Sequence, residues 1–272
     1  MSKTSKELAY IYDLFIAPTW RDCFDQLFTE KIGVPKLGRV LEVNCGTGGL
    51  AIEMATSLAA QGDVTAVDCS SEMIEIAQAK ASISKIKNIS FLVSPPSKLS
   101  FYSNSFDLII CDVSLTETSE IVPQLAEMVR LARPGGRVVL FTTTKGSFDE
   151  FFSIFWEALY SCSLDERLLA GLEELINERF SVSEGEQMMK QAGLSSVKTF
   201  LKKEEFTFET AEDFFKAPLI EIYLLEKWFS ILPKQNRASV RAALEKIIER
   251  ERGSFQFDLS IKATLLAGSK PE

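Results

Sequence analysis

Short apolar runs alternate with amphipathic stretches through the first half of the chain. The apolar runs are rich in β-branched and aliphatic residues and cover 39–43, 64–68, 89–93, 106–112 and 137–142. Helical spacing of apolar residues lies between them, at 50–60, 72–82 and 120–132. Short apolar strands that alternate with helices are typical of a parallel sheet buried on both faces. We therefore expect an α/β fold with a doubly wound, mostly parallel, seven-stranded sheet.

The pattern changes on both sides of this alternating region. Two amphipathic helices, separated near Pro18, precede it, and long helical segments on either side of a strand at 195–201 follow it. We expect these segments to be insertions that form a lid rather than a separately folding domain. The single domain predicted over residues 1–272 then consists of an N-terminal helical cap (1–37), a core (38–144), two helical lid insertions (145–182 and 207–252) and a final strand (255–268).

A glycine turn follows the first predicted strand, in the run Val40-Leu41-Glu42-Val43-Asn44-Cys45-Gly46-Thr47-Gly48-Gly49. Glycine permits positive φ values and lets a ligand approach the backbone closely. The helix that opens next directs free N–H groups at whatever lies over the turn. A strand, a glycine turn and a helix in this order can hold a nucleotide-like cofactor. The candidate cofactor-binding residues here are Glu42, Asn44, Cys45, Gly46, Thr47 and Gly48.

Two interpretations compete for this turn. With Asn44 in the first position, it matches a GxGxxG dinucleotide motif of a nicotinamide-dependent oxidoreductase. With Glu42 closing the strand, it reads instead as acid-x-x-x-Gly-x-Gly. In both interpretations Asp68, at the end of the second predicted strand, accepts the ribose hydroxyls of the cofactor.

Four further segments resemble class I S-adenosylmethionine-dependent methyltransferases of the small-molecule group that includes the ubiquinone and menaquinone enzymes. They are Cys69-Ser70-Ser71-Glu72-Met73, Leu99-Ser100-Phe101, Ser105-Phe106-Asp107-Leu108 and Leu131-Ala132-Arg133-Pro134-Gly135-Gly136. The resemblance covers about residues 38 to 143 well. It implies a Rossmann-like fold, S-adenosyl-L-methionine as the cofactor, and methyl transfer to an O, N or C nucleophile of a small molecule by in-line displacement.

The resemblance also implies roles for individual residues. Asp68 would hold the ribose, Met73 would lie against the adenine, and Cys69 is a further candidate for cofactor binding. Asp112, at the end of the fourth predicted strand, would hold the methionine amino group or orient a substrate. The family's usual acid after the third strand, which accepts from the adenine amine, is replaced by Pro95. Ser94 or Ser97 could substitute for it, or packing could hold the adenine.

Substrate contacts are expected from both helical regions. Tyr12, Trp20 and Arg21 resemble residues that close over the cofactor in this group, and Arg21 could meet a carboxylate. The aromatic segment after residue 147 offers Phe148, Phe152 and Trp156 as wall residues of a substrate site. No catalytic residue is identified, because an amine nucleophile needs only positioning whereas a hydroxyl needs a base.

Composition narrows the other possibilities. The net charge of −8 argues against a nucleic-acid partner, and no apolar run is long enough for stable membrane insertion. The absence of histidine excludes Ser-His-Asp and Cys-His hydrolases and a His-ligated zinc site, and no metal is expected. Five scattered cysteines and no visible secretion signal indicate a cytoplasmic protein with reduced thiols. Asn44 and Pro95 keep open a non-catalytic binding protein of the same fold.

Overall fold

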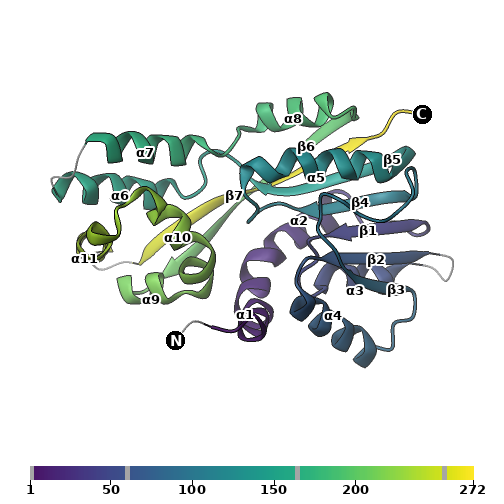
Figure 1. The fold of residues 1–272 in the computed structure, drawn as a ribbon, viewed down its shortest axis with the longest axis horizontal. Helices are drawn as coiled ribbons and strands as arrows, with labels where there is room; N and C mark the ends of the chain where they lie inside the picture. The colour runs from purple at the N-terminus through teal and green to yellow at the C-terminus, as the bar shows by residue number, and fades with distance from the viewer. Residues whose placement is uncertain (1–2, 59–61, 163–165, 253–255) are drawn as a thin grey trace. The chain divides into compact units, whose positions relative to one another are not determined.

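The structure is a computed structural model that describes residues 3–58, 62–162, 166–252 and 256–272. Its seven-stranded sheet has the order β3-β2-β1-β4-β5-β7-β6 (Figure 1). The strands are β1 (Arg39–Val43), β2 (Asp63–Asp68), β3 (Ile89–Val93), β4 (Phe106–Asp112), β5 (Ala132–Thr143), β6 (Ser195–Phe208) and β7 (Phe257–Ser269). The predicted doubly wound, mostly parallel fold is confirmed.

The chain reverses its direction of winding at the centre of the sheet. From β1 it moves outward to β2 and β3, and it then returns to the other side of β1 to form β4 and β5. All four pairs formed by these strands are parallel. Ligands of open α/β sheets bind outside the carboxyl ends of the strands at such a reversal. The carboxyl ends of β1 and β4 therefore mark the place for a site.

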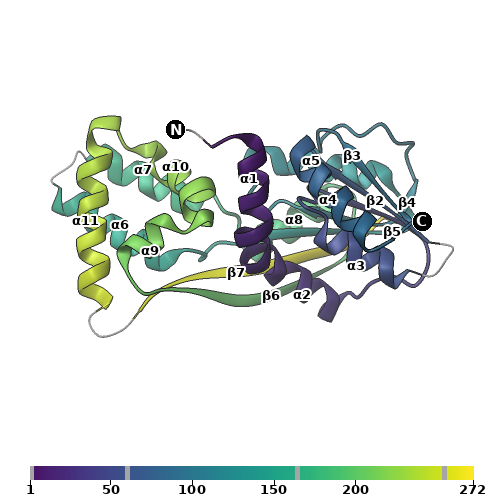
Figure 2. The same ribbon diagram turned by 90° about the horizontal axis from the view of Figure 1, so that it is seen from below.

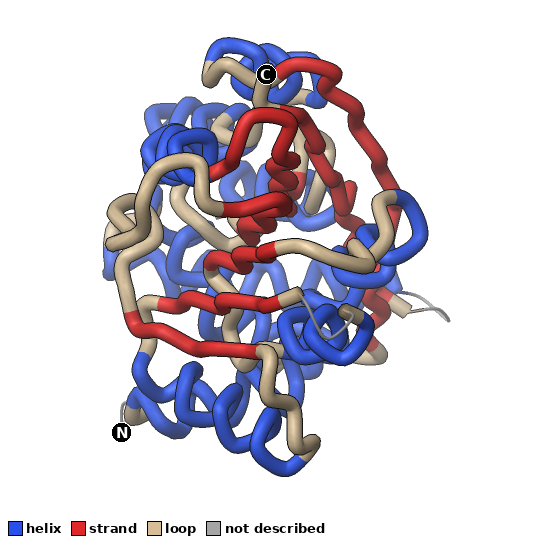
Figure 3. The backbone as a smooth tube through the Cα atoms, turned by 90° about the vertical axis from the view of Figure 1, so that its right-hand side faces the viewer, coloured by secondary structure: helices blue, strands red, loops and turns tan. Residues whose placement is uncertain are grey.

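Helices lie on both sides of these strands (Figure 3). Helices α3 (Gly49–Ser57) and α4 (Ser71–Ile83) pack on β2 and β3, and α5 (Thr118–Leu131) packs on β4. Both faces of β1 are covered, which explains its continuous run of buried residues. Among these, Glu42 is a wholly buried carboxylate in an otherwise apolar segment.

The N-terminal region is continuously helical from Ser5 to Lys31 (Figure 2). It contains α1 (Ser5–Ile11), the π-helix η1 (Tyr12–Arg21) and α2 (Asp22–Lys31). The expected separation near Pro18 is wrong, because Pro18 lies inside η1. In an α-helix the proline ring clashes with the carbonyl four residues back. A π-helix instead bonds each N–H to the carbonyl five residues back, so its wider turn changes this contact. The Thr19 hydroxyl also donates to the carbonyl oxygen of Phe15, over 2.9 Å.

The Pro-Gly-Gly segment belongs to β5 instead of preceding it as a turn. Phe106 pairs with Ala132 and Leu108 with Arg137, so five steps along β5 oppose two along β4. This bulge contains Gly135 at φ +73°, a left-handed value that glycine adopts without strain. Gly135 and Gly136 exchange backbone hydrogen bonds with Lys270. The end of β7 thus lies beside the beginning of β5, and β7 runs antiparallel to it.

The chain divides into two compact units. Unit 1 comprises residues 1–142, 182–201 and 263–272, and unit 2 comprises 143–181 and 202–262. Unit 1 also contains α8 (Val182–Gln191). The helices of unit 2 are α6 (Asp149–Ser161), α7 (Glu166–Asn177), α9 (Ala211–Lys216), η2 (Ile220–Leu224), α10 (Leu225–Trp228), η3 (Phe229–Ile231) and α11 (Lys234–Arg252). Almost all of the two predicted insertions falls in unit 2, and their role as a lid stays a prediction.

Candidate functional site

The glycine turn after β1 takes three left-handed residues to reach α3. Asn44, Gly46 and Gly48 have φ values of +56°, +53° and +75°. Asparagine is among the non-glycine residues that tolerate this conformation. The Asn44 amide also donates to the backbone oxygen of Asp112 over 2.8 Å and to Oε1 of Gln124 over 3.0 Å. These bonds link the turn to the carboxyl end of β4 and to α5.

The two glycines of the turn make room for other parts of unit 1. A Cβ at Gly46 would lie 2.8 Å from the ring of Tyr12. A Cβ at Gly48 would lie 2.8 Å from the Cβ of Ala77 and 3.0 Å from the ring of Phe91. The sequence predicts that these glycines let a ligand approach the backbone. In the structure they allow η1, α4 and β3 to pack against the turn.

Asp68 holds the carboxyl end of β2 against this turn. Its Oδ2 accepts from the backbone N–H of Gly46 over 2.8 Å, and its Oδ1 accepts from that of Ser70 over 3.0 Å. Each carboxylate oxygen retains a further acceptor site. The N-cap of α4 is Ser70, whose hydroxyl accepts from the backbone of Met73. Asp68 therefore fixes the turn and still has acceptor capacity for a ligand.

The other residues predicted beside Asp68 lie near the surface. Cys69 and Pro95 are exposed, as is Ser97, while Met73 and Ser94 are half-buried. The N–H of Ser94 donates to the backbone oxygen of Asp68 over 3.0 Å, which places the end of β3 beside that of β2. Burial raises the pKa of the Cys69 thiol, with a further contribution from the neighbouring Asp68. This thiol is thus protonated at neutral pH.

Arg21 is buried among three carboxylates that converge from different elements. Its Nε donates to Asp25 over 2.7 Å, and its Nη2 donates to Oε1 of Glu42 over 2.5 Å. Its Nη1 donates to Asp112 over 3.2 Å and to the backbone oxygen of Asn44 over 3.3 Å. Its predicted role is that it could meet a carboxylate. It meets carboxylates of its own chain, and one cation faces three acidic groups.

Burial changes the protonation of this acidic cluster. It raises the pKa of Glu42 to about 8, against the opposing effect of Arg21. It likewise raises the pKa of Asp25 to about 6. In addition, Oε2 of Glu42 is buried without a hydrogen-bond partner among the described residues. A positively charged ligand group placed here would compensate the excess of acid.

The stability of the protein should depend on pH through Glu42. Between about pH 5 and pH 8 the folded protein retains a proton that the unfolded chain has released, because folding raises this pKa. Raising the pH across this window therefore lowers the free energy of unfolding, by up to about 1.4 kcal/mol per pH unit for one group. We expect Glu42→Gln, which cannot titrate, to flatten this decline in urea unfolding measured from pH 5.5 to 8. Glu75→Gln, on the exposed side of α4, should keep the wild-type slope, and an equally steep slope in Glu42→Gln would contradict the assignment.

A second ionic contact joins η1 to α4, and its carboxylate also binds the glycine turn. Oδ1 of Asp13 accepts from Nζ of Lys80 over 2.7 Å and from the hydroxyl of Thr47 over 2.5 Å. Together with Tyr12 and Cys45, these side chains border a cavity of about 150 Å³ within unit 1. Lys80 is not among the site residues predicted from the sequence. Nothing in the sequence around Lys80 indicates this contact, because its partner Asp13 is 67 residues away.

Asp25 and Gln124 were also missed as site residues. Asp25 follows Arg21 by four residues, a spacing at which opposite charges meet on one helix face, so this pair could have been found. Gln124 lies buried beside Ile121, Leu125 and Met128 on the apolar side of α5. A polar residue on such a face indicates a buried hydrogen bond, but the sequence does not name the partner.

The predicted substrate contacts fall in both units. In unit 1, Tyr12 is buried against Gly46, and the fully buried Trp20 donates from its indole N–H to Ser114 over 2.9 Å. In unit 2, Phe148 and Phe152 are buried, with their rings 5.3 and 6.0 Å from that of Trp228. Trp156 is half-buried. Phe148 and Phe152 thus belong to the aromatic core of unit 2, and a substrate contact for this group stays a prediction.

The arrangement in unit 1 suits a ligand that carries hydroxyl groups and also a positive charge. Backbone N–H groups, the Asp68 carboxylate and the acidic cluster all lie at the carboxyl ends of neighbouring parallel strands. Among the residues that the structure describes, no group of acidic or cysteine side chains is arranged to hold a metal ion. No helix within those ranges has the length and apolarity needed to cross a membrane.

Known proteins resemble this chain in sequence and in fold. A demethylmenaquinone methyltransferase from Lactococcus lactis is 36% identical over 105 residues, which are 39% of this chain and 42% of that protein. The chain spans about half the length of the curated relatives that it matches.

Two solved structures share the fold at low sequence identity. The YcgJ protein from Bacillus subtilis has a TM-score of 0.59 at 18% identity, over 92% of this chain and 99% of that one. The second is a phosphoethanolamine N-methyltransferase from Haemonchus contortus, solved with phosphomonomethylethanolamine and S-adenosylhomocysteine. It has a TM-score of 0.58 at 18% identity, over 99% of this chain and 59% of that chain. The model of the ubiE/COQ5 methyltransferase family matches residues 6–208. The chain belongs to the ubiE/COQ5 methyltransferase family.

Proposed function

We propose that this protein transfers the methyl group of S-adenosyl-L-methionine to a small molecule. The observation that carries this proposal is the group of acceptors around the glycine turn, at the reversal point of the sheet. Asp68 offers acceptor sites for the ribose hydroxyls, and the acidic cluster around Arg21 offers compensation for a positive charge. The cofactor carries both a sulfonium and an ammonium group, so these residues fit it.

The adenine end of the proposed cofactor site is the part with the fewest acceptors. Pro95, in the position of the family's adenine-binding acid, has neither a side-chain acceptor nor an N–H group. The half-buried Ser94 is adjacent and its backbone is fixed to β2. We propose that Ser94, Met73 and Cys69 contact the adenine, with packing contributing more than hydrogen bonds do.

The proposed reaction needs positioning more than proton transfer. When bound, the cofactor supplies an electrophilic methyl group on sulfur. The residues of this chain would orient it, exclude water and hold the nucleophile in line with the carbon–sulfur bond. Tyr12, packed over Gly46, would cover the turn from the side of η1. Since the sequence contains no histidine, any proton released by the substrate must pass to an aspartate, glutamate, tyrosine, lysine or cysteine side chain or to water.

Demethylmenaquinone is the first substrate to test, because it is the substrate in the name of the curated relatives. We propose that an O, N or C nucleophile of a small molecule attacks the methyl carbon by in-line displacement. The aromatic residues Phe148, Phe152 and Trp156 remain proposed contacts of a planar or apolar substrate. Tyr12 and Trp20 are proposed contacts from η1.

Binding of S-adenosylhomocysteine tests the cofactor assignment directly. At about 100 times its Kd, the ligand should stabilise the folded protein by about 2.7 kcal/mol. For a chain of this size that corresponds to a rise in Tm of about 5–10 °C, measured by scanning calorimetry. NADH at the same concentration should leave Tm unchanged. Transfer of a radioactive methyl group from S-adenosylmethionine to demethylmenaquinone then tests the reaction.

Each alternative function has its own outcome in these experiments. Pro95 leaves open that the protein is a non-catalytic relative with the same fold. This alternative is favoured if S-adenosylhomocysteine does not change Tm at any concentration. A shift with NADH but none with S-adenosylhomocysteine would favour a nicotinamide-dependent oxidoreductase. A shift with S-adenosylhomocysteine and no transfer to demethylmenaquinone would retain the cofactor and reject this substrate.

A further inference from the structure

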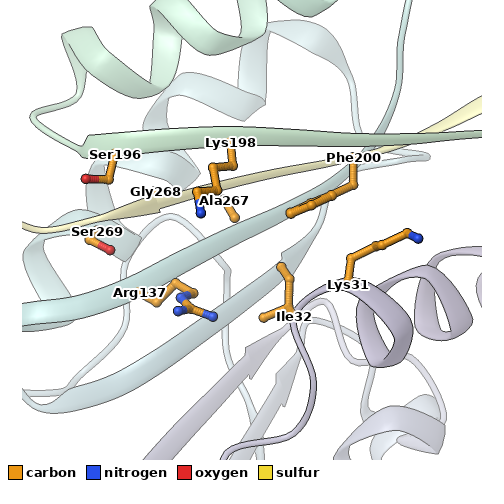
Figure 4. Close-up of a pocket in the computed structure, with 9 residues that line it drawn as sticks. All are labelled: Lys31, Ile32, Arg137, Ser196, Lys198, Phe200, Ala267, Gly268 and Ser269. Carbon is orange, nitrogen blue, oxygen red and sulfur yellow. The ribbon is translucent and has the colours of Figure 1, made fainter.

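Unit 1 contains another cavity, of about 350 Å³, whose lining residues are shown in Figure 4. One of its lining residues is Arg137, which pairs with Leu108 near the beginning of β4. The proposed cofactor site lies at the other end of the same strand, at Asp112. Asp112 is four positions beyond Leu108, which is about 13 Å along a strand. The two sites are therefore distinct.

The lining of this cavity is cationic. It includes Lys31 from the end of α2, Arg137 from β5 and Lys198 from β6, and it includes no acidic residue. Acidic residues outnumber basic ones in the chain by 38 to 30, so a cavity whose charged lining residues are all cations departs from the average composition. Among the residues that the structure describes, no carboxylate lies within ion-pair distance of these three cations.

The cations lie on two sides of an apolar surface. Figure 4 shows the side chains of Lys198 and Arg137 at the same end of the hollow as Ser269, while Ile32 and Phe200 lie between them and Lys31. An arginine guanidinium and a lysine ammonium bind phosphate oxygens through charge-assisted hydrogen bonds, and a hydroxyl can add a further donor. The ring of Phe200 offers a contact for an apolar body attached to the anion.

We propose that this cavity binds a phosphate or diphosphate group carried by a small molecule, apart from the proposed cofactor. Lys198 and Arg137 hold the anion with Ser269, and Phe200 and Ile32 contact the group to which it is attached. A multivalent phosphate neutralises more of the cationic lining than a single carboxylate would. The volume is within the range of small-molecule sites.

Titration calorimetry on the full-length protein with inorganic pyrophosphate at low salt tests this proposal. We expect saturable binding that the double variant Arg137→Gln/Lys198→Gln weakens by at least about tenfold, because it removes two charged donors. Lys203→Gln is the matched control on β6, since Lys203 already pairs with Glu205 over 2.7 Å. Its affinity for pyrophosphate should stay within about twofold of the wild type, as for an exposed pair.

Further experiments distinguish a lipid headgroup from a free phosphate as the ligand. They also test whether the cavity is separate from the proposed cofactor site. Cosedimentation with phosphatidylglycerol vesicles, lost in the double variant and reversed by pyrophosphate, would support the site and assign the phosphate to a lipid headgroup. Absence of binding to both probes would overturn the proposal, as would equal losses in the double variant and in Lys203→Gln. Competition between pyrophosphate and S-adenosylhomocysteine would overturn it as well. Unchanged Tm with S-adenosylhomocysteine would reject the proposed function and leave pyrophosphate binding as a separate result.

Discussion

Replacing Arg21 with methionine is expected to destabilise the protein by about 3–5 kcal/mol near pH 8, the largest effect predicted here. The substitution keeps an unbranched side chain but leaves Glu42, Asp25 and Asp112 buried near one another without a cation. It also removes the guanidinium that lies 5.1 Å from the ring of Phe141. Urea unfolding followed by circular dichroism measures the free energy of unfolding.

Two controls separate charge compensation from a general loss of packing. Arg133→Met removes a cation that pairs with Asp107 over 2.6 Å but is 58% exposed, so it should cost about 1 kcal/mol or less. Lowering the pH to 5.5 should reduce the deficit of Arg21→Met, because the orphaned carboxylates then take up protons. A deficit that is the same at both pH values would show that packing, not charge, is responsible.

Replacing Asp68 with asparagine is expected to weaken S-adenosylhomocysteine binding by about 10- to 100-fold, since charged hydrogen bonds contribute about 1.5–3 kcal/mol. Asparagine retains one acceptor but turns an amide donor toward the N–H of either Gly46 or Ser70. The variant therefore loses one of the two hydrogen bonds that Asp68 accepts from the backbone. It also loses the negative charge that is proposed to face the ribose of the cofactor. Titration calorimetry gives the change in Kd.

The control for this change lies on the same strand. Asp63→Asn alters an exposed carboxylate at the other end of β2, 3.8 Å from Arg39, and should leave the Kd unchanged. Urea unfolding of both variants shows whether they remain folded at the temperature of the titration. Wild-type affinity in a folded Asp68→Asn variant would reject Asp68 as a ligand of the cofactor.

The central strands could be predicted closely from the sequence. The expected ranges of β1, β3 and β4 agree with those in the structure. The helix-covered strands β1 and β4 carry runs of apolar residues that end at polar ones. The reversal point and the position of Asp68 follow from the same pattern, since the carboxyl ends of parallel strands share one edge.

Other elements could not be predicted because their pattern lacks the regular period. In η1 the wider turn changes which residues share a face, so Tyr12, Ile16 and Trp20 are all buried. Strand β6 extends to Phe208, seven residues past its expected end. Its second half begins with Lys202 and Lys203, each paired with a glutamate two residues later. The sequence pattern of such a solvated strand resembles that of a loop.

The ionic cluster at the site was only partly foreseeable. Arg21 and Asp112 were candidates, but they are 91 residues apart, and nothing local indicates that they meet. The pair Arg21 and Asp25 could be read from its helical spacing. Glu42 joins this pair because of how η1 packs on β1. This packing is a tertiary contact that the local sequence does not indicate.

The Arg21 cluster also determines how ligand binding exchanges protons with the solvent. Without histidine in the sequence, Glu42 and Asp25 are the described side chains whose pKa is shifted to between 6 and 8. A cationic ligand near them would favour their ionised forms, so binding would release protons. The heat of binding would then vary with the ionisation enthalpy of the buffer, and the apparent affinity would rise with pH.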